Sequence, residues 1–197
     1  MNTRTLLLLL VATAGCKHVE WTAAQLQGRW VSPCAAVHAD IGFSQQSLQE
    51  TETFTAPPAQ TVEIAQRYYT DAQCKEPYFT RTVSAAAEVG AYTLPAGART
   101  LDLTELAARV RPETIAAASD LSQQFYCSTD QWQPGVELDI AGRSCNGVPT
   151  PPVQSRVYQI AQVIADLLFL GSRASADGTT PATRPTVLSQ TPYERAH

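Results

Sequence analysis

The feature that most constrains this chain is a series of short segments with strand composition, each ended by turn-forming residues. Six such segments lie before the predicted helix, at residues 28–32, 48–55, 61–69, 78–85, 88–94 and 100–104. They are rich in Thr, Val, Tyr and Phe, and turn formers such as Ala56-Pro57-Pro58 and Pro95-Ala96-Gly97 separate them. Strand segments that follow one another in this way predict an antiparallel meander.

The second half adds one helix and further strands. Pro112 followed by Glu113 is a helix start signal, and a helical face over residues 113–125 carries Ile115, Ala118 and Phe125. Strands are expected at 136–140, 157–164 and 167–170, and a last short edge strand at 184–188, where Pro185 cannot donate to a ladder. Together the elements predict a mainly β fold, an antiparallel barrel with one mid-chain helix.

The N-terminus has the composition of a sorting signal. Arg4 precedes a short apolar run at residues 5–12, which ends in Thr13-Ala14-Gly15-Cys16. The run is shorter than the about 20 residues of a spanning helix and is typical of a signal-peptide core. We therefore divide the chain into a signal peptide at 1–15, a tether at 16–25 and a single barrel domain at 26–197.

Small residues before Cys16 resemble the lipobox of bacterial lipoproteins, although Thr13 stands where that pattern has Leu or Val. The resemblance implies cleavage after Gly15 and acylation of Cys16, which would anchor the domain to a membrane. Because Lys17 rather than aspartate follows the cysteine, the resemblance favours the outer membrane in an organism with two. The alternative is an ordinary secretory signal with an incidental cysteine.

Four cysteines remain after Cys16, and an even number in an exported chain predicts two disulfides. Of the three connectivities, we favour those that close local loops, Cys34 with Cys74 and Cys127 with Cys145. A zinc site is the alternative. No C-x-x-C pair is present, His18, His38 and His197 do not cluster in sequence, and only Cys34 and His38 have a ligand-like spacing. We therefore expect no metal.

Composition argues against nucleic acid and against common enzyme chemistry. The net charge is -4, and twelve arginines and two lysines are scattered without a basic stripe. No nucleophile elbow, phosphate-binding loop or zinc-protease motif occurs. The remaining acid–base candidates are His38 with Asp40, interpreted as a loop, and two carboxylate pairs interpreted as solvated strand faces: Glu50 with Glu52, and Asp102 with Glu105. We therefore expect no catalytic residue and no cofactor.

Gly28-Arg29-Trp30 resembles the G-x-W signature that opens the first strand of lipocalins and other calycin barrels, where the tryptophan closes one end. The wider cysteine and tryptophan pattern resembles bacterial lipocalin-like lipoproteins. The resemblance implies a buried Trp30 covered by a late basic residue, for which Arg184 and Arg173 are the candidates. Two features depart from the family: Tyr69-Thr70-Asp71 stands near the second motif in a different order, and the helix lies mid-chain.

These observations predict a membrane-anchored, non-enzymatic lipoprotein whose barrel takes a small apolar ligand. The alternative is a protein-binding module, such as a protease inhibitor acting through an extended segment at 17–25, or an adhesion factor. Trp132, between two cysteines, is the candidate for an exposed aromatic contact. A hollow barrel interior would favour ligand binding, whereas a filled one would favour surface binding.

Overall fold

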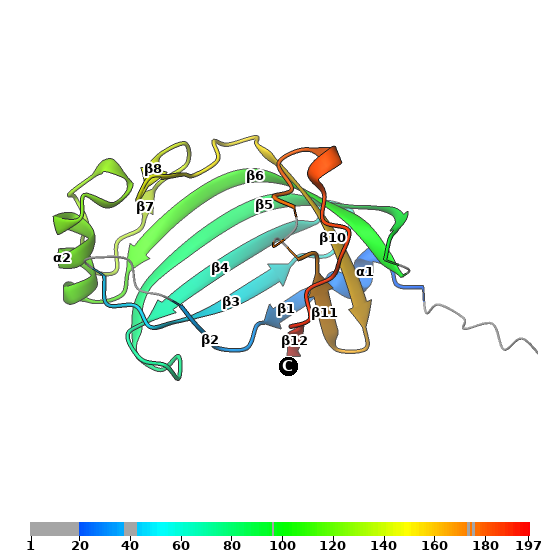
Figure 1. Ribbon diagram of the computed structural model, residues 1–197, viewed down its shortest axis with the longest axis horizontal. Helices are drawn as coiled ribbons and strands as arrows, with labels where there is room; N and C mark the ends of the chain where they lie inside the picture. Colours follow the sequence, from blue (N-terminus) through cyan, green and yellow to red (C-terminus); the bar gives the residue numbers. More distant parts are fainter. Residues whose placement is uncertain (1–19, 38–42, 96, 173, 175) are drawn as a thin grey trace, which may run out of the picture.

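The computed structural model describes residues 20–37, 43–95, 97–172, 174 and 176–197 and is mainly β (Figure 1). Eight antiparallel strands form a closed ring in the order β1, β3, β4, β5, β6, β10, β11, β12, and the ring closes because β1 pairs with both β12 and β3. Their bounds are β1 Gly28–Val31, β3 Ser47–Phe54, β4 Thr61–Tyr69, β5 Pro77–Thr93, β6 Ala98–Pro112, β10 Arg156–Ile164, β11 Leu167–Leu170 and β12 Tyr193–Ala196. The predicted fold class is confirmed, and the barrel is consistent with a lipocalin-like fold.

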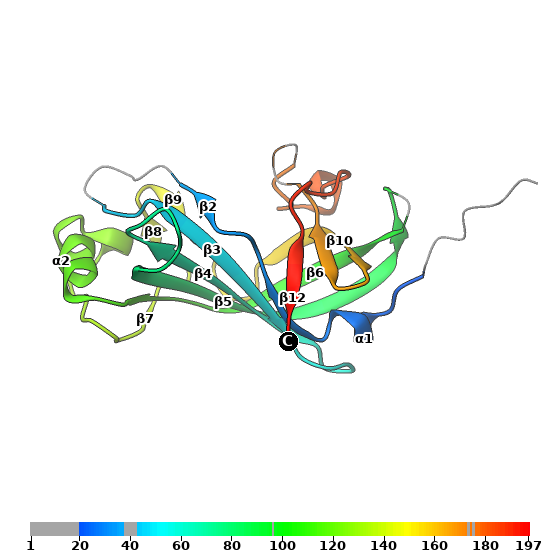
Figure 2. The same cartoon turned by 90° about the horizontal axis from the view of Figure 1, so that it is seen from below.

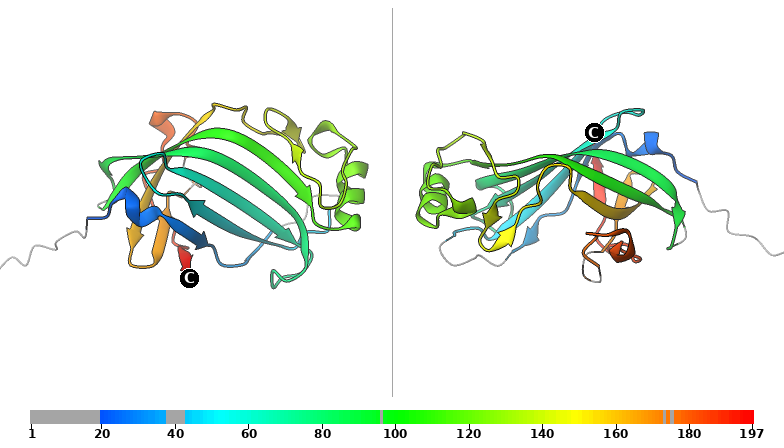
Figure 3. Two further views of the ribbon diagram at one scale, coloured as in Figure 1. Left: turned by 180° about the vertical axis from the view of Figure 1, so that it is seen from behind. Right: turned by 90° about the horizontal axis from the view of Figure 1, so that it is seen from above.

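Shorter elements extend the sheet and cover its ends. They are α1 Ala23–Leu26, β2 Ala35–Ala36, α2 Ile115–Gln123, β7 Leu138–Asp139, β8 Ser144–Cys145, β9 Val148–Pro149 and the 3-10 turns Tyr126–Ser128 and Pro181–Thr183. β2 pairs with β3 beyond the end of β1, and β7 pairs with β6 beyond the end of β10. The sheet β3–β6 therefore continues past the barrel toward α2, whereas α1 lies at the opposite end (Figures 2 and 3).

Two apolar cores lie along these long strands. The barrel core contains the buried residues Trp21, Leu26, Trp30, Phe54, Val62, Ala85, Leu101, Leu103, Ala161, Val163 and Leu168. The second core, which we call the helix-end core, contains Phe43, Tyr78, Phe79, Ala108, Val110, Ala117, Ala118, Leu121, Cys127, Trp132, Ile140 and Cys145. β5 and β6 contribute to both, which explains their lengths of 17 and 15 residues.

Trp30 closes one end of the barrel. Its side chain is fully buried, and its indole N–H donates to the carbonyl of Leu26 at 2.7 Å. The guanidinium of Arg195 lies 4.1 Å from the ring centroid and donates to the carbonyls of Gln25 and Gln27. Arg195 therefore holds α1 and Trp30 together through a cation–π contact and two hydrogen bonds.

The basic residue over Trp30 is thus Arg195, and the expectation of Arg184 is wrong. β12 pairs with β1 so that Arg195 stands opposite Trp30 in register. Arg184 instead forms an ion pair with Asp102 at 2.5 Å. Arg173, the other candidate, lies outside the described residues.

Gly28 occupies a backbone position that only glycine adopts easily. Its φ is +119°, and a Cβ built there would lie 2.9 Å from Nη1 of Arg195. An alanine would therefore meet both backbone strain and the Arg195 side chain. This explains why the first strand opens on glycine directly before the buried tryptophan.

The helix begins later than predicted. Pro112 is the last residue of β6, where it needs no ladder donor, and Thr114 is the N-cap, accepting from the amide of Ala117 at 3.1 Å. The helix ends at Gln123, and Phe125 adopts a left-handed conformation with φ of 49°. The mid-chain helix is confirmed, with narrower bounds.

Three strand predictions need correction. Segments 78–85 and 88–94 form the single strand β5, because only a register shift at Ser84 and Ala85, and no turn, separates them. Segment 136–140 is reduced to the two residues of β7, and 184–188 is not a strand, since Leu188 forms only an isolated bridge with Gly171. The last ring strand is β12, which propensity did not reveal.

Both predicted disulfides are present. Cys34–Cys74 ties the segment after β1 to the β4–β5 connection, with a Cα–Cα distance of 5.9 Å, and Cys127–Cys145 joins the turn after α2 to β8. The favoured connectivity is therefore confirmed. Among the described residues, no helix is both long and apolar enough to cross a membrane.

Candidate functional site

The barrel closes around polar as well as apolar side chains. Alternate residues of each strand face inward, and these include Glu50 and Glu52 on β3, Arg81 on β5 and Glu105 on β6. They border an interior hollow of about 230 Å³. Its lining is Glu50, Ile64, Gln66, Arg81, Val83, Ala85, Leu103, Glu105, Pro151, Val157, Asp177 and Thr179. We call this space the barrel hollow.

One wall of the barrel hollow carries a connected polar network. Arg81 donates to the side-chain oxygen of Gln66 at 3.0 Å, and the amide of Gln66 donates to Oε2 of Glu50 at 2.7 Å. The hydroxyl of Tyr193 donates to Oε1 of the same carboxylate. Both oxygens of Glu50 are therefore satisfied, and the network joins β3, β4, β5 and β12.

Glu105 lines the same hollow without such support. The residue is only 4% exposed, and its Oε1 is buried with no hydrogen-bond partner. Burial raises the pKa of Glu105, and the positive charge of Arg81 opposes that rise. A buried carboxyl oxygen without a hydrogen-bond partner is costly to the fold, and this makes Glu105 a candidate site residue.

The exposed side of the barrel hollow carries a further carboxylate. The backbone N–H of Thr179 and the hydroxyls of Thr183 and Thr179 lower the pKa of Asp177, which stays ionised at neutral pH. Among the residues that the structure describes, the lining then contains three carboxyl groups and one guanidinium, that of Arg81. The hollow is acidic at one end and apolar where Ile64, Val83, Leu103 and Val157 line it.

A second, larger space adjoins this one. It has a volume of about 530 Å³ and shares Glu50 with the barrel hollow. Glu52, Gln159 and Leu170 also line it, and Glu52 is only 4% exposed. Pro33, Cys34 and Ala35, which are exposed, line it too, so this space opens to the surface, and the shared Glu50 links its polar lining to that of the barrel hollow.

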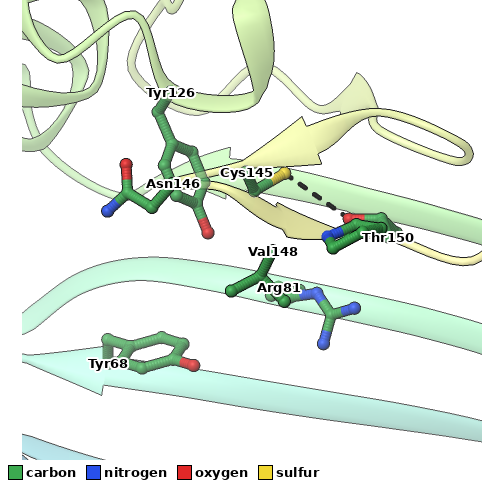
Figure 4. Close-up of a pocket in the computed structure, with 8 residues that line it drawn as sticks. Tyr68, Arg81, Tyr126, Cys145, Asn146, Val148 and Thr150 are labelled. Atoms are coloured by element: carbon green, nitrogen blue, oxygen red, sulfur yellow. Dashed lines mark hydrogen bonds between the residues drawn. The ribbon is translucent and has the colours of Figure 1, made fainter.

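A third hollow lies outside the barrel core, at the helix end (Figure 4). It measures about 650 Å³ and lies between the strands that carry Tyr68 and Arg81 and the β8–β9 hairpin, with Tyr126 beside it. The hydroxyl of Thr150 lies 3.5 Å from the sulfur of Cys145 within the hairpin. Arg81 lines both this hollow and the barrel hollow.

Several residues that the sequence analysis considered as candidate site residues lie in other environments than expected. The expectation that Glu52 and Glu105 lie on solvated strand faces is wrong, because barrel closure turns both into the interior. Trp132 is not an exposed contact: it is 6% exposed and its N–H donates to the carbonyl of Tyr126. Trp30 and Gly28 lie at the barrel end, as the resemblance implies.

The remaining candidates do not meet in the described part of the chain. Cys34 is disulfide-bonded and is no metal ligand, and His38, Asp40 and Cys16 lie outside the described residues. Across the ranges that the structure describes, no three His, Cys, Asp or Glu side chains are grouped closely enough to hold a metal ion. The acidic hollow is therefore a set of separate carboxylates.

Sequence reasoning missed Arg81, Gln66 and Tyr193 as interior residues. One signal was available for Arg81, because it alternates with Phe79 and Val83 on one strand face. A charged residue at an apolar-facing position indicates a buried polar site. Neither a scan against protein-family models nor a search of curated proteins found a match to this chain.

Glu105→Gln is expected to raise the melting temperature of the unliganded protein at pH about 7.5, by about 2 to 4 °C for each kcal/mol of relieved desolvation. Because the folded-state pKa of Glu105 is raised, the folded state binds the proton more tightly than the unfolded state, and stability is lost as pH rises through the folded pKa. The difference between variant and wild type should shrink toward pH about 3, below the ordinary glutamate pKa, where the carboxyl is protonated in both states. Scanning calorimetry at both pH values measures it.

Glu63→Gln is the matched control, since Glu63 is exposed on the outer face of β4. It should leave the melting temperature within the small range of surface substitutions. A Glu105 variant that melts below wild type at neutral pH would show that this carboxylate stabilises the fold.

Proposed function

We propose that the chain is a lipid-anchored, extracytoplasmic, non-enzymatic protein of lipocalin-like, calycin type whose barrel binds a small molecule. The observation that carries the proposal is the barrel hollow of about 230 Å³, with a further 530 Å³ space beside it. Eight-stranded barrels are wide enough to hold one small ligand, and a mixed apolar and polar lining is typical of ligand sites. Trp30 with Arg195 over its ring supports the lipocalin-like assignment.

The N-terminal segment bears on the alternative, a protease inhibitor that inserts residues 17–25 into a cleft. Trp21 is buried in the barrel core, and its indole N–H donates to the carbonyl of Gly97 at 3.0 Å. Its own carbonyl accepts from Tyr92 and Arg99. The part of the predicted tether from Trp21 onward is therefore packed against the barrel, which favours ligand binding over cleft insertion.

Filling the barrel hollow should weaken binding of an uncharged probe. 1-Hexanol is expected to shift the methyl resonances of Val83 and Leu103 in the wild-type protein, because both residues line the hollow. Val157→Phe places a larger side chain in the same space and should weaken this binding about tenfold or more. An NMR titration of methyl-labelled protein measures the affinity.

Val136→Phe is the control for added bulk, because Val136 is 52% exposed and lies outside the lining. It should bind 1-hexanol as the wild type does. Wild-type protein whose interior methyl resonances do not respond to the probe would refute the ligand-binding proposal.

The membrane part of the proposal concerns Cys16, to which a lipobox-like segment leads. Cys16→Ser should move the protein from the membrane fraction to the soluble fraction, because the acyl chains that hold it would be absent. Mass spectrometry of the wild type should show loss of residues 1–15 and an acylated Cys16. Wild-type protein that is soluble and unmodified would refute the anchor. In an organism with two membranes, we place the protein at the outer one.

A further inference from the structure

The barrel hollow has a charge imbalance that an apolar ligand leaves unused. Glu50, Glu105 and Asp177 line the hollow together with Arg81, whose guanidinium donates to Gln66. Glu50 accepts from two neighbours, whereas Oε1 of Glu105 accepts from none. The hollow therefore contains a carboxylate, that of Glu105, with an unused hydrogen-bond acceptor.

We propose, building on the ligand-binding function above, that the barrel hollow takes a small organic cation, a protonated primary amine whose ammonium group pairs with the carboxylate of Glu105. An ammonium carries donors only, and a carboxylate carries acceptors only, so the two complement each other. Charge-assisted hydrogen bonds of this kind are roughly twice as strong as neutral ones. The ligand nitrogen would supply Glu105 with a hydrogen-bond donor that no described side chain of the lining provides to its buried oxygen.

The rest of the lining defines the rest of the ligand. Val83, Leu103 and Val157 provide an apolar wall beside Glu105, which suits a short hydrocarbon chain attached to the amine. A dry cavity of about 150 Å³ can hold benzene, so a hollow of about 230 Å³ accommodates a somewhat larger molecule. The chemical class is therefore a small alkyl- or arylalkylamine.

Other occupants fit the lining less well. Among the described residues of the lining, an anion would meet three carboxyl groups and one guanidinium, that of Arg81. A metal ion would need clustered ligands, and the carboxylates among the described residues do not form such a group. A neutral ligand would offer Glu105 at most an uncharged donor, such as a hydroxyl, and that hydrogen bond is weaker than one from an ammonium group.

The test compares three probes of one size, hexylamine, 1-hexanol and hexanoate, on protein purified from cells that express the full chain. Hexylamine is protonated near neutral pH, as a lysine side chain is. NMR titrations should show hexylamine binding about tenfold or more tightly than 1-hexanol, with hexanoate weakest. The shifted methyl groups should be those of Val83, Leu103 and Val157.

Two variants distinguish the effect of the Glu105 charge from the effect of the size of its side chain. Glu105→Gln keeps the size of the side chain and should remove the preference for hexylamine while 1-hexanol binding stays measurable. Glu63→Gln makes the same chemical change on the outer face and should keep the preference. Chemical shifts outside the hollow report that each variant is folded.

Two results would overturn the inference in distinguishable ways. Equal binding of hexylamine and 1-hexanol to the wild type, or a preference that survives Glu105→Gln, would refute the cation site and leave the ligand-binding proposal intact. No response to any of the three probes would refute both.

Discussion

Trp30→Ala should lower the free energy of unfolding by about 3 to 5 kcal/mol, the range for truncating a large buried aromatic residue. The side chain is fully buried in the barrel core, so its loss leaves a cavity at the closed end. The carbonyl of Leu26 loses its indole donor, and Arg195 loses the ring on which it lies. Urea unfolding monitored by circular dichroism with the disulfides intact measures the change.

Phe125→Ala is the control for removing an aromatic side chain, because Phe125 is 59% exposed. It should change stability by less than about 0.5 kcal/mol. Trp30→Phe should fall between the two, since it keeps part of the buried area and loses the N–H donor. Equal unfolding midpoints for Trp30→Ala and wild type would contradict the burial of this residue and the lipocalin-like assignment with it.

Removing the Cys34–Cys74 disulfide should cost about 3 to 4 kcal/mol. The bond joins residues 40 positions apart, and its absence lets the unfolded chain explore more conformations. Cys34 is exposed, so a Cys34→Ala, Cys74→Ala double variant creates no core cavity at that residue. The change in stability therefore reports mainly on the cross-link, and urea unfolding without reductant measures it.

The native spectrum of the double variant is the control, because the eight-stranded ring does not depend on the cross-link for any strand pairing. Its far-ultraviolet circular dichroism should match that of the wild type below the transition. If the double variant lowers the free energy of unfolding by less than about 1 kcal/mol, the unfolded chain is already compact around this loop.

Strand identity was predictable where composition and turn signals agree. Segments 61–69 and 167–170 coincide with β4 and β11, because β-rich residues end at clear turns. The strand β12 was not predictable from the sequence, because its residues Tyr-Glu-Arg-Ala have no strong β propensity. They form a strand only through pairing with β1 and β11. Tertiary pairing overrides local preference at such positions.

The interior site was less predictable. Alternation in β3 places Glu50 and Glu52 on one face, and the same alternation fits a solvated face equally well. Ring closure decides between the two, since it makes that face the inside of a barrel. The same closure brings Tyr193 to Glu50, across 143 positions of sequence.

The amino-acid sequence by itself determined the β class and the mid-chain helix, because these depend on local composition, spacing and hydrophobicity. Short loop lengths favoured the disulfide pairing that the structure contains, and the G-x-W resemblance implied the burial of Trp30. Only the tertiary structure decided that Arg195 rather than Arg184 covers Trp30, and that Glu105 lies unpaired beside an apolar wall. Both outcomes depend on register between strands far apart in the chain. Strand register is set by the packing of the whole barrel, and no single segment encodes it.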